Sequence, residues 1–256
     1  MLKTLPLLML PAMLWAQGQI PVRPLPSRVV DLTYPVSERF PNFEGTAQSP
    51  FHAEVTGTIE KNGYFSRRYR TQEHFGTHMD APAHFGPGQR TVDRLTPEQL
   101  FVPGVVLDIG PQAAGDADYA LTVADVLAWE KKNGAIRPKS MVLLRTGWGR
   151  RAGEMAAYRN ADSTGASHSP SFSLEAARLL VDQRQAVAFG IDNLSVDVGR
   201  STDYPVHRYT QQRGLYHLEN LANLDRLPPR VFLIVAPTKL EGGSGAQARV
   251  WAVVEK

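Results

Sequence analysis

The sequence predicts a mixed α/β fold in which short strands alternate with a few helices. Three observations support this prediction. The chain has 256 residues, 43% of them hydrophobic and 21% charged, which is ordinary for a globular domain with a large core. Short apolar runs rich in branched side chains recur along it. Patterns typical of helix starts lie between these runs, so both α/β and α+β arrangements with several sheets are compatible with the sequence.

Six segments are predicted to be strands because each is a short run of apolar, mostly branched residues. They are 29–32, 105–109, 141–144, 186–191, 231–235 and 250–254. No internal repeat or second linker interrupts them, so residues 28–256 are predicted to form one domain.

Three helix starts lie between these strands, each marked by a hydroxyl side chain that can cap a first turn: Thr96, Thr122 and Ser173. Proline at the first helical position follows the first of them. Asp125 follows the second after three residues, as in a capping box, and that helix is expected to end near Gly134. The third helix continues to residue 180 or 181 as an apolar stripe at helical spacing.

The first 27 residues resemble an export signal and a lead-in. Residues 1–16 contain one lysine followed by an apolar run that is too short for a membrane span, and Pro6 and Pro11 would break a buried helix. We interpret this segment as a secretory signal peptide and the proline-rich residues 17–27 as a flexible lead-in. The sequence therefore predicts an exported bacterial protein, periplasmic or secreted, with no membrane span after signal removal.

Charge and composition narrow the classes of partner. The formal charge is +3 and becomes +2 when Lys3 leaves with the signal, too little for a nucleic-acid binder. The arginines at 67, 68 and 70 are interpreted as a solvated face, with a substrate-steering rim as the alternative. The chain has no cysteine, so disulfides and thiolate ligands are excluded.

The segment HFGTHMDAPAHF, residues 74–85, holds three of the chain's seven histidines and one aspartate. Imidazole nitrogen and carboxylate oxygen are ligands that Zn²⁺ and Mn²⁺ accept in hydrolases. An extended chain would separate His74 from Asp80 by roughly 20 Å, so the backbone must turn here if both are to reach one ion. Gly76 and Pro82 are typical of a turning segment. His84, the last histidine of the cluster, is either a further ligand or a general acid/base, and we favour the second.

This segment resembles the HxGTHxDxPxH motif of the cyclase family of metal-dependent hydrolases, whose members include bacterial kynurenine formamidase and isatin hydrolase. The likeness extends to RTGW at 145–148, GIDNLSVD at 190–197, VHRYTQQRGLYHLENL at 206–221 and LEGGSGAQARV at 240–250. The resemblance implies a swivelling β/β/α fold and a homodimer. It also implies that His74, His78 and Asp80 bind a metal ion and that His84 is the catalytic acid/base.

The resemblance further implies a second metal site, because binuclear members hold a second ion with a histidine and a glutamate at the places of His207 and Glu219. The two ions would share Asp80. His217 lies two residues before Glu219, and a strand would put both on one face, so the choice between the two histidines stays open. We expect one or two ions of Zn²⁺ or Mn²⁺ per site.

Several other residues are candidates for the pocket. Phe65 and Trp148 are predicted to form an apolar wall around an aromatic substrate, and Ser244, between glycines, is predicted to hydrogen-bond substrate or water. Three polar residues of the 190–197 segment resemble a triad by type only, and we interpret them as turn and capping residues: Asp192, Ser195 and Asp197.

These observations predict a metal-dependent hydrolase that cleaves the amide, lactam or lactone bond of a small aromatic substrate, similar to isatin or N-formylkynurenine, with metal-activated water. Two alternatives remain. Two histidines and one carboxylate also form the site of non-haem Fe(II) oxygenases, although an oxygenase would need neither His84 nor the His207 and Glu219 pair. The second alternative is a non-catalytic exported protein that only binds metal.

Overall fold

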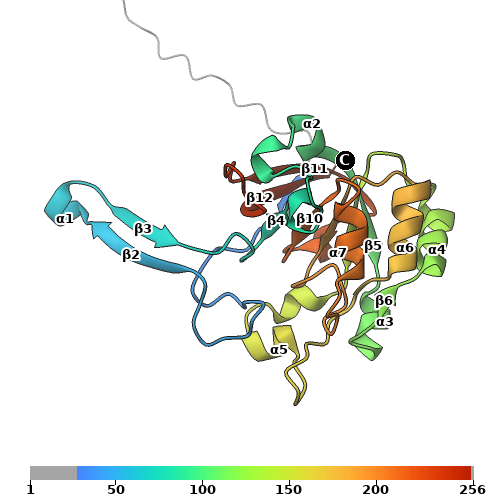
Figure 1. Ribbon diagram of the computed structural model, residues 1–256, viewed down its shortest axis with the longest axis horizontal. Helices are drawn as coiled ribbons and strands as arrows, with labels where there is room; N and C mark the ends of the chain where they lie inside the picture. Colours follow the sequence, from blue (N-terminus) through green and yellow to red (C-terminus); the bar gives the residue numbers. More distant parts are fainter. Residues whose placement is uncertain (1–27, 255–256) are drawn as a thin grey trace, which may run out of the picture.

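A closed β-barrel is the centre of the computed structural model, which describes residues 28–254 (Figure 1). The predicted signal peptide and lead-in lie outside the described residues. Eight strands form the main sheet in the order β1-β12-β11-β5-β7-β9-β10-β4, and β4 also pairs with β12, which closes the sheet. They are β1 (Arg28–Asp31), β4 (His78–Asp80), β5 (Phe101–Asp108), β7 (Met141–Arg145), β9 (Ala188–Ile191), β10 (Tyr216–Glu219), β11 (Arg230–Pro237) and β12 (Gly245–Val254).

The barrel is a mixed sheet, as predicted. The pairs β5–β7, β7–β9 and β9–β10 are parallel, and the other pairs are antiparallel. Side chains alternate between its two faces. In β7, Met141 and Leu143 point into the barrel interior, whereas Val142 and Leu144 belong to a second core under the helices.

Helices cover one outer side of the barrel, where Figure 1 shows α4, α6 and α7. The helices are α1 (Ile59–Asn62), α2 (Pro97–Leu100), α3 (Gly110–Gly115), α4 (Val123–Asn133), α5 (Met155–Arg159), α6 (Leu174–Arg178) and α7 (Pro205–Gln211). Shorter turns are η1 (Pro82–His84), η2 (Val92–Arg94), η3 (Trp148–Arg151), η4 (Leu179–Gln183, a π-helical turn) and η5 (Leu224–Arg226). No helix within 28–254 is both long and apolar enough to cross a bilayer.

The three predicted helix starts are confirmed. Thr122 and Asp125 form the capping box of α4, and Gly134 ends that helix with φ 81°. Ser173 caps α6, whose last turns continue as η4 to Gln183. Thr96 begins α2, but this helix has only four residues because β5 begins at the next position.

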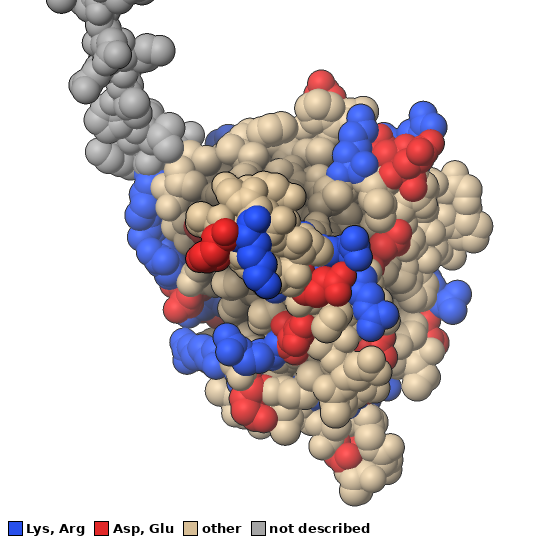
Figure 2. All heavy atoms as spheres, turned by 90° about the vertical axis from the view of Figure 1, so that its left-hand side faces the viewer, with Lys and Arg blue, Asp and Glu red and all other residues tan. Residues whose placement is uncertain are grey.

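Two small sheets lie outside the barrel. Strands β6 (Ala120–Leu121) and β8 (Ser171–Phe172) form a short parallel pair. Strands β2 (His52–Gly57) and β3 (Ser66–Arg70) form an antiparallel hairpin that projects from the barrel with α1 near its end (Figure 1). Figure 2 views the molecule from the side of this hairpin and shows basic and acidic side chains interspersed on that face. The arginines at 67, 68 and 70 are exposed there, as expected of a solvated face.

Candidate metal centre

Strand β4 positions the centre of the histidine cluster. The chain turns at Gly76, whose φ is 68°, and then enters β4. His78 and Asp80 lie two residues apart on this strand, so both side chains point to the same face. The backbone therefore turns between His74 and Asp80, which confirms the turn predicted from the sequence. Strand β4 pairs with β10 on one side and β12 on the other, and His78 lies opposite Glu219.

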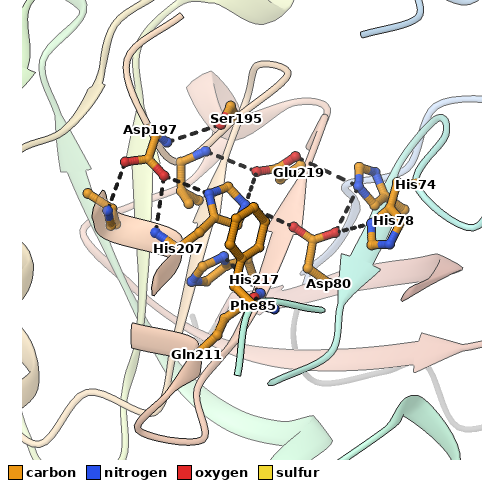
Figure 3. Close-up of polar contacts among 12 residues, drawn as sticks. His74, His78, Asp80, Phe85, Ser195, Asp197, His207, Gln211, His217 and Glu219 are labelled. Atoms are coloured by element: carbon orange, nitrogen blue, oxygen red, sulfur yellow. Dashed lines mark hydrogen bonds and ion pairs between the residues drawn. The ribbon is translucent and has the colours of Figure 1, made fainter. Parts of the chain in front are cut away.

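His74 and His78 both face the carboxylate of Asp80, and these three residues form the first candidate ligand set (Figure 3). Its Oδ1 lies 2.5 Å from Nδ1 of His74 and 3.1 Å from Nε2 of His78. Asp80 and His78 are buried, with 1% and 3% of their surface exposed, whereas His74 is half-buried. The structure thus brings together the three residues that the sequence motif predicted as one ligand set.

His207 and Glu219 lie on the other side of Asp80. His207, on α7, places Nε2 3.3 Å from Oδ2 of Asp80 and 3.4 Å from Oε1 of Glu219. Glu219, on β10, places Oε2 3.7 Å from Nε2 of His78. The backbone amide of Val196 donates to Oε1 of Glu219 and orients the carboxylate. Residues more than a hundred positions apart in the chain therefore complete one buried cluster.

His217 also lies close to Asp80 and His207, but both of its ring nitrogens are already hydrogen-bonded. Nε2 lies 2.7 Å from Oγ1 of Thr210, and Nδ1 lies 3.3 Å from Nε2 of Gln211. Burial and then the charge of His207 hold the pKa of His217 well below its usual value, so the ring is neutral. The geometry therefore favours His207 over His217 as the histidine of the second ligand pair.

His74, His78 and His207 each turn one ring nitrogen toward Asp80. The other, outer nitrogen of each ring is hydrogen-bonded to an oxygen acceptor. Nδ1 of His78 donates to the carbonyl of Gly76, at 3.0 Å, because a carbonyl oxygen only accepts. Nδ1 of His207 donates to Oδ2 of Asp197, at 2.7 Å. Nε2 of His74 lies 3.0 Å from Oγ of Ser244. In the neutral rings the inner nitrogens then present lone pairs to carboxylate oxygens. A proton or a cation must lie between them, and a divalent ion fits this donor set.

Protonation of the cluster follows the same geometry. Burial opposes the charged form of His78, but the charge of Asp80, its hydrogen bond and Glu219 outweigh burial and raise the pKa of His78 to about 9. His207 behaves similarly: hydrogen bonds to Asp197, Asp80 and Glu219 outweigh burial and raise its pKa well above the usual value. Burial and then the charge of Asp80 raise the pKa of Glu219. Without a metal ion, protons on the histidines balance the buried carboxylates.

Asp197 has a role that sequence reasoning missed. Its carboxylate accepts the backbone amides of Val206 and His207 at the start of α7, so its interpretation as a capping residue is confirmed. The same carboxylate also holds the ring of His207. Ser195 accepts the amide of Asp197 in a local turn, as predicted, whereas Asp192 accepts the amides of Thr146 and Gly147, 46 and 45 residues earlier in the chain. Nothing in the local sequence distinguishes Asp197 from these two, because its second partner is set by the packing of α7.

His84 lies beside the ligand cluster and not within it. Its ring stacks on that of His74, with centroids 4.0 Å apart, and lies 6.1 Å from that of His207. Burial, followed by the charges of the neighbouring histidines, outweighs the attraction of Asp80 and lowers the pKa of His84 to about 4. The ring is therefore neutral near pH 7 and able to accept a proton.

A cavity of about 660 Å³ opens above the cluster. His74, His78, Asp80, His84, His207 and Glu219 all line it. The remaining wall combines polar side chains, among them Glu73 and Ser195, with apolar ones: Phe43, Phe75, Phe85, Leu194 and Tyr204. A cavity of this size and character suits a small aromatic molecule.

The three predicted pocket residues do not line this cavity within the described chain. Trp148 is 2% exposed and packs among Phe40, Phe75 and Tyr158, so it supports the wall from behind. Phe65 is 62% exposed near the end of the β2–β3 hairpin, because this short hairpin has no core of its own to cover it. The hydroxyl of Ser244 points to His74, as described above. None of the three thus lines the cavity, and contact with a substrate stays a prediction for each of them.

Comparison with known proteins agrees with the motif. The Cyclase family model matches residues 30–198. The isatin hydrolase of Roseibium aggregatum is 37% identical over 193 residues, which cover 72% of this chain and 73% of that protein. The kynurenine formamidase of Paracidovorax citrulli is 28% identical over 231 residues, 88% of this chain and 95% of that protein.

A solved structure shares the whole architecture. Isatin hydrolase A from Ralstonia solanacearum superposes with a TM-score of 0.84 at 37% identity, covering 89% of this chain and 92% of that one. The mixed α/β fold with a closed sheet and few helices is thus the fold of these hydrolases. The chain therefore belongs to the cyclase family and is a metal-dependent amidohydrolase.

Proposed function

We propose that this protein hydrolyses the ring amide of a small aromatic lactam of the isatin type. The observation that carries the proposal is a neutral imidazole, His84, stacked beside a buried His and Asp cluster inside an aromatic-lined cavity. The relative at 37% identity is named isatin hydrolase, which supports the lactam over an open-chain formamide. N-formylkynurenine and simple lactones are the substrates to compare with it.

We infer that His74, His78 and Asp80 would hold one divalent ion, and that His207 and Glu219, sharing Asp80, would hold a second. Imidazole and carboxylate donors suit Zn²⁺ or Mn²⁺. When bound, such an ion lowers the pKa of a water ligand to about 7 and polarises a carbonyl oxygen.

His84 would supply the proton transfers of the reaction. Its neutral ring accepts a proton from the attacking water as the new C–O bond forms at the lactam carbonyl. It then returns that proton to the ring nitrogen as the C–N bond breaks, leaving an amine and a carboxylic acid, and the second proton of the water is released to solvent as the acid ionises to a carboxylate. The aromatic side chains hold the substrate ring and keep other water away from it.

Replacement of His84 by alanine tests this function. Because a positioned general acid/base contributes about 10²–10⁴-fold to the rate, kcat for the best lactam should fall by at least about a hundredfold. Metal content, measured in parallel, should stay at the wild-type level, since His84 is not a ligand in this scheme. Unchanged hydrolysis would exclude the role of His84, and activity that requires O₂ would favour an oxygenase.

We further propose that the β2–β3 hairpin forms a homodimer interface. Val55, Ile59, Tyr64, Phe65 and Tyr69 are all more than half exposed there. A two-stranded hairpin is marginally stable alone, so a second subunit would stabilise it. The mass in solution should be twice that of the chain, and the double substitution Tyr64→Ser with Phe65→Ser should halve it. A monomeric wild-type protein would exclude the interface.

The export of the protein is a separate proposal, supported by the composition of residues 1–16. Fusion of these residues to a reporter that is active only outside the bacterial cytoplasm should give activity. A reporter that stays in the cytoplasm would contradict it.

A further inference from the structure

A network at the wall of the cavity links Glu73, which lines the cavity and precedes His74, to the glycine-rich loop before β12. The carboxylate of Glu73 accepts three hydrogen bonds on one oxygen, Oε2. Two come from the backbone amide and hydroxyl of Ser244, at 3.0 and 2.6 Å, and the third from the amide of Gly245, at 3.1 Å. The two segments lie about 170 residues apart in the chain. Glu73 therefore fastens this loop to the start of the ligand segment.

The direction of each hydrogen bond follows from the chemistry of the groups. An ionised carboxylate only accepts, so the single hydroxyl proton of Ser244 goes to Glu73. The hydroxyl oxygen is then left as an acceptor, and its other partner is Nε2 of His74, at 3.0 Å. Nε2 must therefore carry a ring proton. In the neutral ring the lone pair of Nδ1 then faces Asp80, 2.5 Å away, where a cation would have to lie between the two atoms.

The loop also restricts rotation of the ring. A methyl group on Gly245 would lie 2.5 Å from Cε1 and 2.9 Å from Nδ1 of His74. The backbone of β12 thus packs directly against the imidazole, and only glycine leaves room for it.

We propose that Glu73 and Ser244 are positioning residues that hold His74 in the tautomer that binds metal. The inference rests on the proposed metal site and adds two residues to it. A partner that fixes the outer nitrogen of a ligand histidine orients the ring and raises its basicity. Ser244 acts through His74 and makes no contact with the cavity in this arrangement.

Ser244→Ala is the decisive variant, because it removes only the hydroxyl and leaves both backbone hydrogen bonds to Glu73. Zn²⁺ affinity, measured on the full mature protein by competition with a chromophoric chelator, should fall about 10–100-fold. ¹H–¹⁵N spectra of the Zn²⁺-loaded protein should show a slowly exchanging proton on Nε2 of His74 in the wild type, and faster exchange of that proton with solvent in the variant, because its acceptor hydroxyl is gone. Glu73→Gln, which keeps the shape but removes the charge, should weaken Zn²⁺ binding to a lesser extent.

Thr164→Ala is a matched control far from the cavity. One oxygen of Asp162 accepts the amide and hydroxyl of Thr164, at 2.8 and 2.6 Å, and the amide of Ala166, at 3.1 Å, which repeats the pattern at Glu73. This control should leave Zn²⁺ affinity unchanged. Equal Zn²⁺ affinity of wild type and Ser244→Ala, or equal weakening in the control, would overturn the proposal. A wild type that binds no Zn²⁺ would instead reject the metal site itself.

Discussion

Asp80 joins the two halves of the candidate metal centre. One of its carboxylate oxygens faces His74 and His78 and the other faces His207. The sequence motif predicted the first half because its residues are neighbours in the chain. The motif does not reveal the contact of Asp197 with His207 or that of Glu73 with Ser244, because each joins segments that meet only after folding.

The hydrogen bond from His207 to Asp197 leads to a prediction about the second ion. In Asp197→Asn an NH₂ group replaces one of the two carboxylate oxygens. This donor would then face another donor, either the amide of Val206 or the amide and imidazole of His207. The affinity of the more weakly bound ion should fall about 10–100-fold. Metal analysis after dialysis at limiting Zn²⁺ should then show about one ion fewer per chain.

Asp192→Asn serves as the control for that variant. Asp192 is also buried and accepts two backbone amides, from Thr146 and Gly147, but it contacts no candidate ligand. It should lower stability without changing metal content. Identical metal content in wild type and Asp197→Asn would contradict the role of Asp197.

The protonation of His78 and His207 predicts how metal affinity depends on pH. Both pKa values are raised in the metal-free protein, that of His78 to about 9, so both rings carry protons at pH 7. A metal ion must displace these protons, and raising the pH toward 9 removes its competitor. Apparent Zn²⁺ affinity should therefore increase from pH 6 to pH 9. Calorimetry in buffers of different ionisation enthalpy should detect proton release, and pH-independent affinity would contradict the assignment.

At the scale of elements, the eight strands of the barrel divide into two groups. The six predicted from apolar runs correspond to β1, β5, β7, β9, β11 and β12, because these strands supply the barrel core. The criterion does not detect β4 and β10, whose short sequences, His78–Asp80 and Tyr216–Glu219, carry histidines and carboxylates. These two strands hold three of the five candidate ligands, His78, Asp80 and Glu219, so their composition reflects the site and not the core.

The close approach of β12 to β4 predicts the effect of a single methyl group. In Gly245→Ala the new carbon would lie 2.5 Å from the ring of His74 and 2.8 Å from the carbonyl of Met79, which is rigid backbone. The substitution should cost about 1–3 kcal/mol of stability and displace His74, with loss of Zn²⁺ affinity. Urea unfolding and chelator competition measure the two effects.

Gly104→Ala separates crowding from metal binding. Its added carbon would meet side chains of Leu233 and Val231 at 2.8 and 2.9 Å inside the barrel, far along the sheet from the ligands. Stability should fall while Zn²⁺ affinity is retained. If Gly245→Ala binds Zn²⁺ as tightly as Gly104→Ala, the close approach of Gly245 to His74 does not affect metal binding.

At the scale of the whole molecule, the candidate ligands connect separate parts of the fold. They come from the turn before β4, from β4 itself, from α7 and from β10. A bound ion would therefore stabilise the folded chain, because the unfolded chain holds these groups apart. Free Zn²⁺ at a hundred times its Kd should add about 2.7 kcal/mol to the free energy of unfolding. Equal urea midpoints with Zn²⁺ and with a chelator would show that the ion does not link these elements.

The amino-acid sequence by itself determined the reaction class and most of the core. A ligand set concentrated in residues 74–85 is visible without a structure, and apolar runs predict strands because burial selects them locally. Only the tertiary structure shows which distant residues lie at the candidate site: it favours His207 over His217, places Asp197 behind His207, and joins Glu73 to Ser244. The physical reason is that these choices depend on which ring nitrogen is already hydrogen-bonded, and those bonds join segments that meet only in the folded chain, such as Thr210 on α7 and His217 on β10.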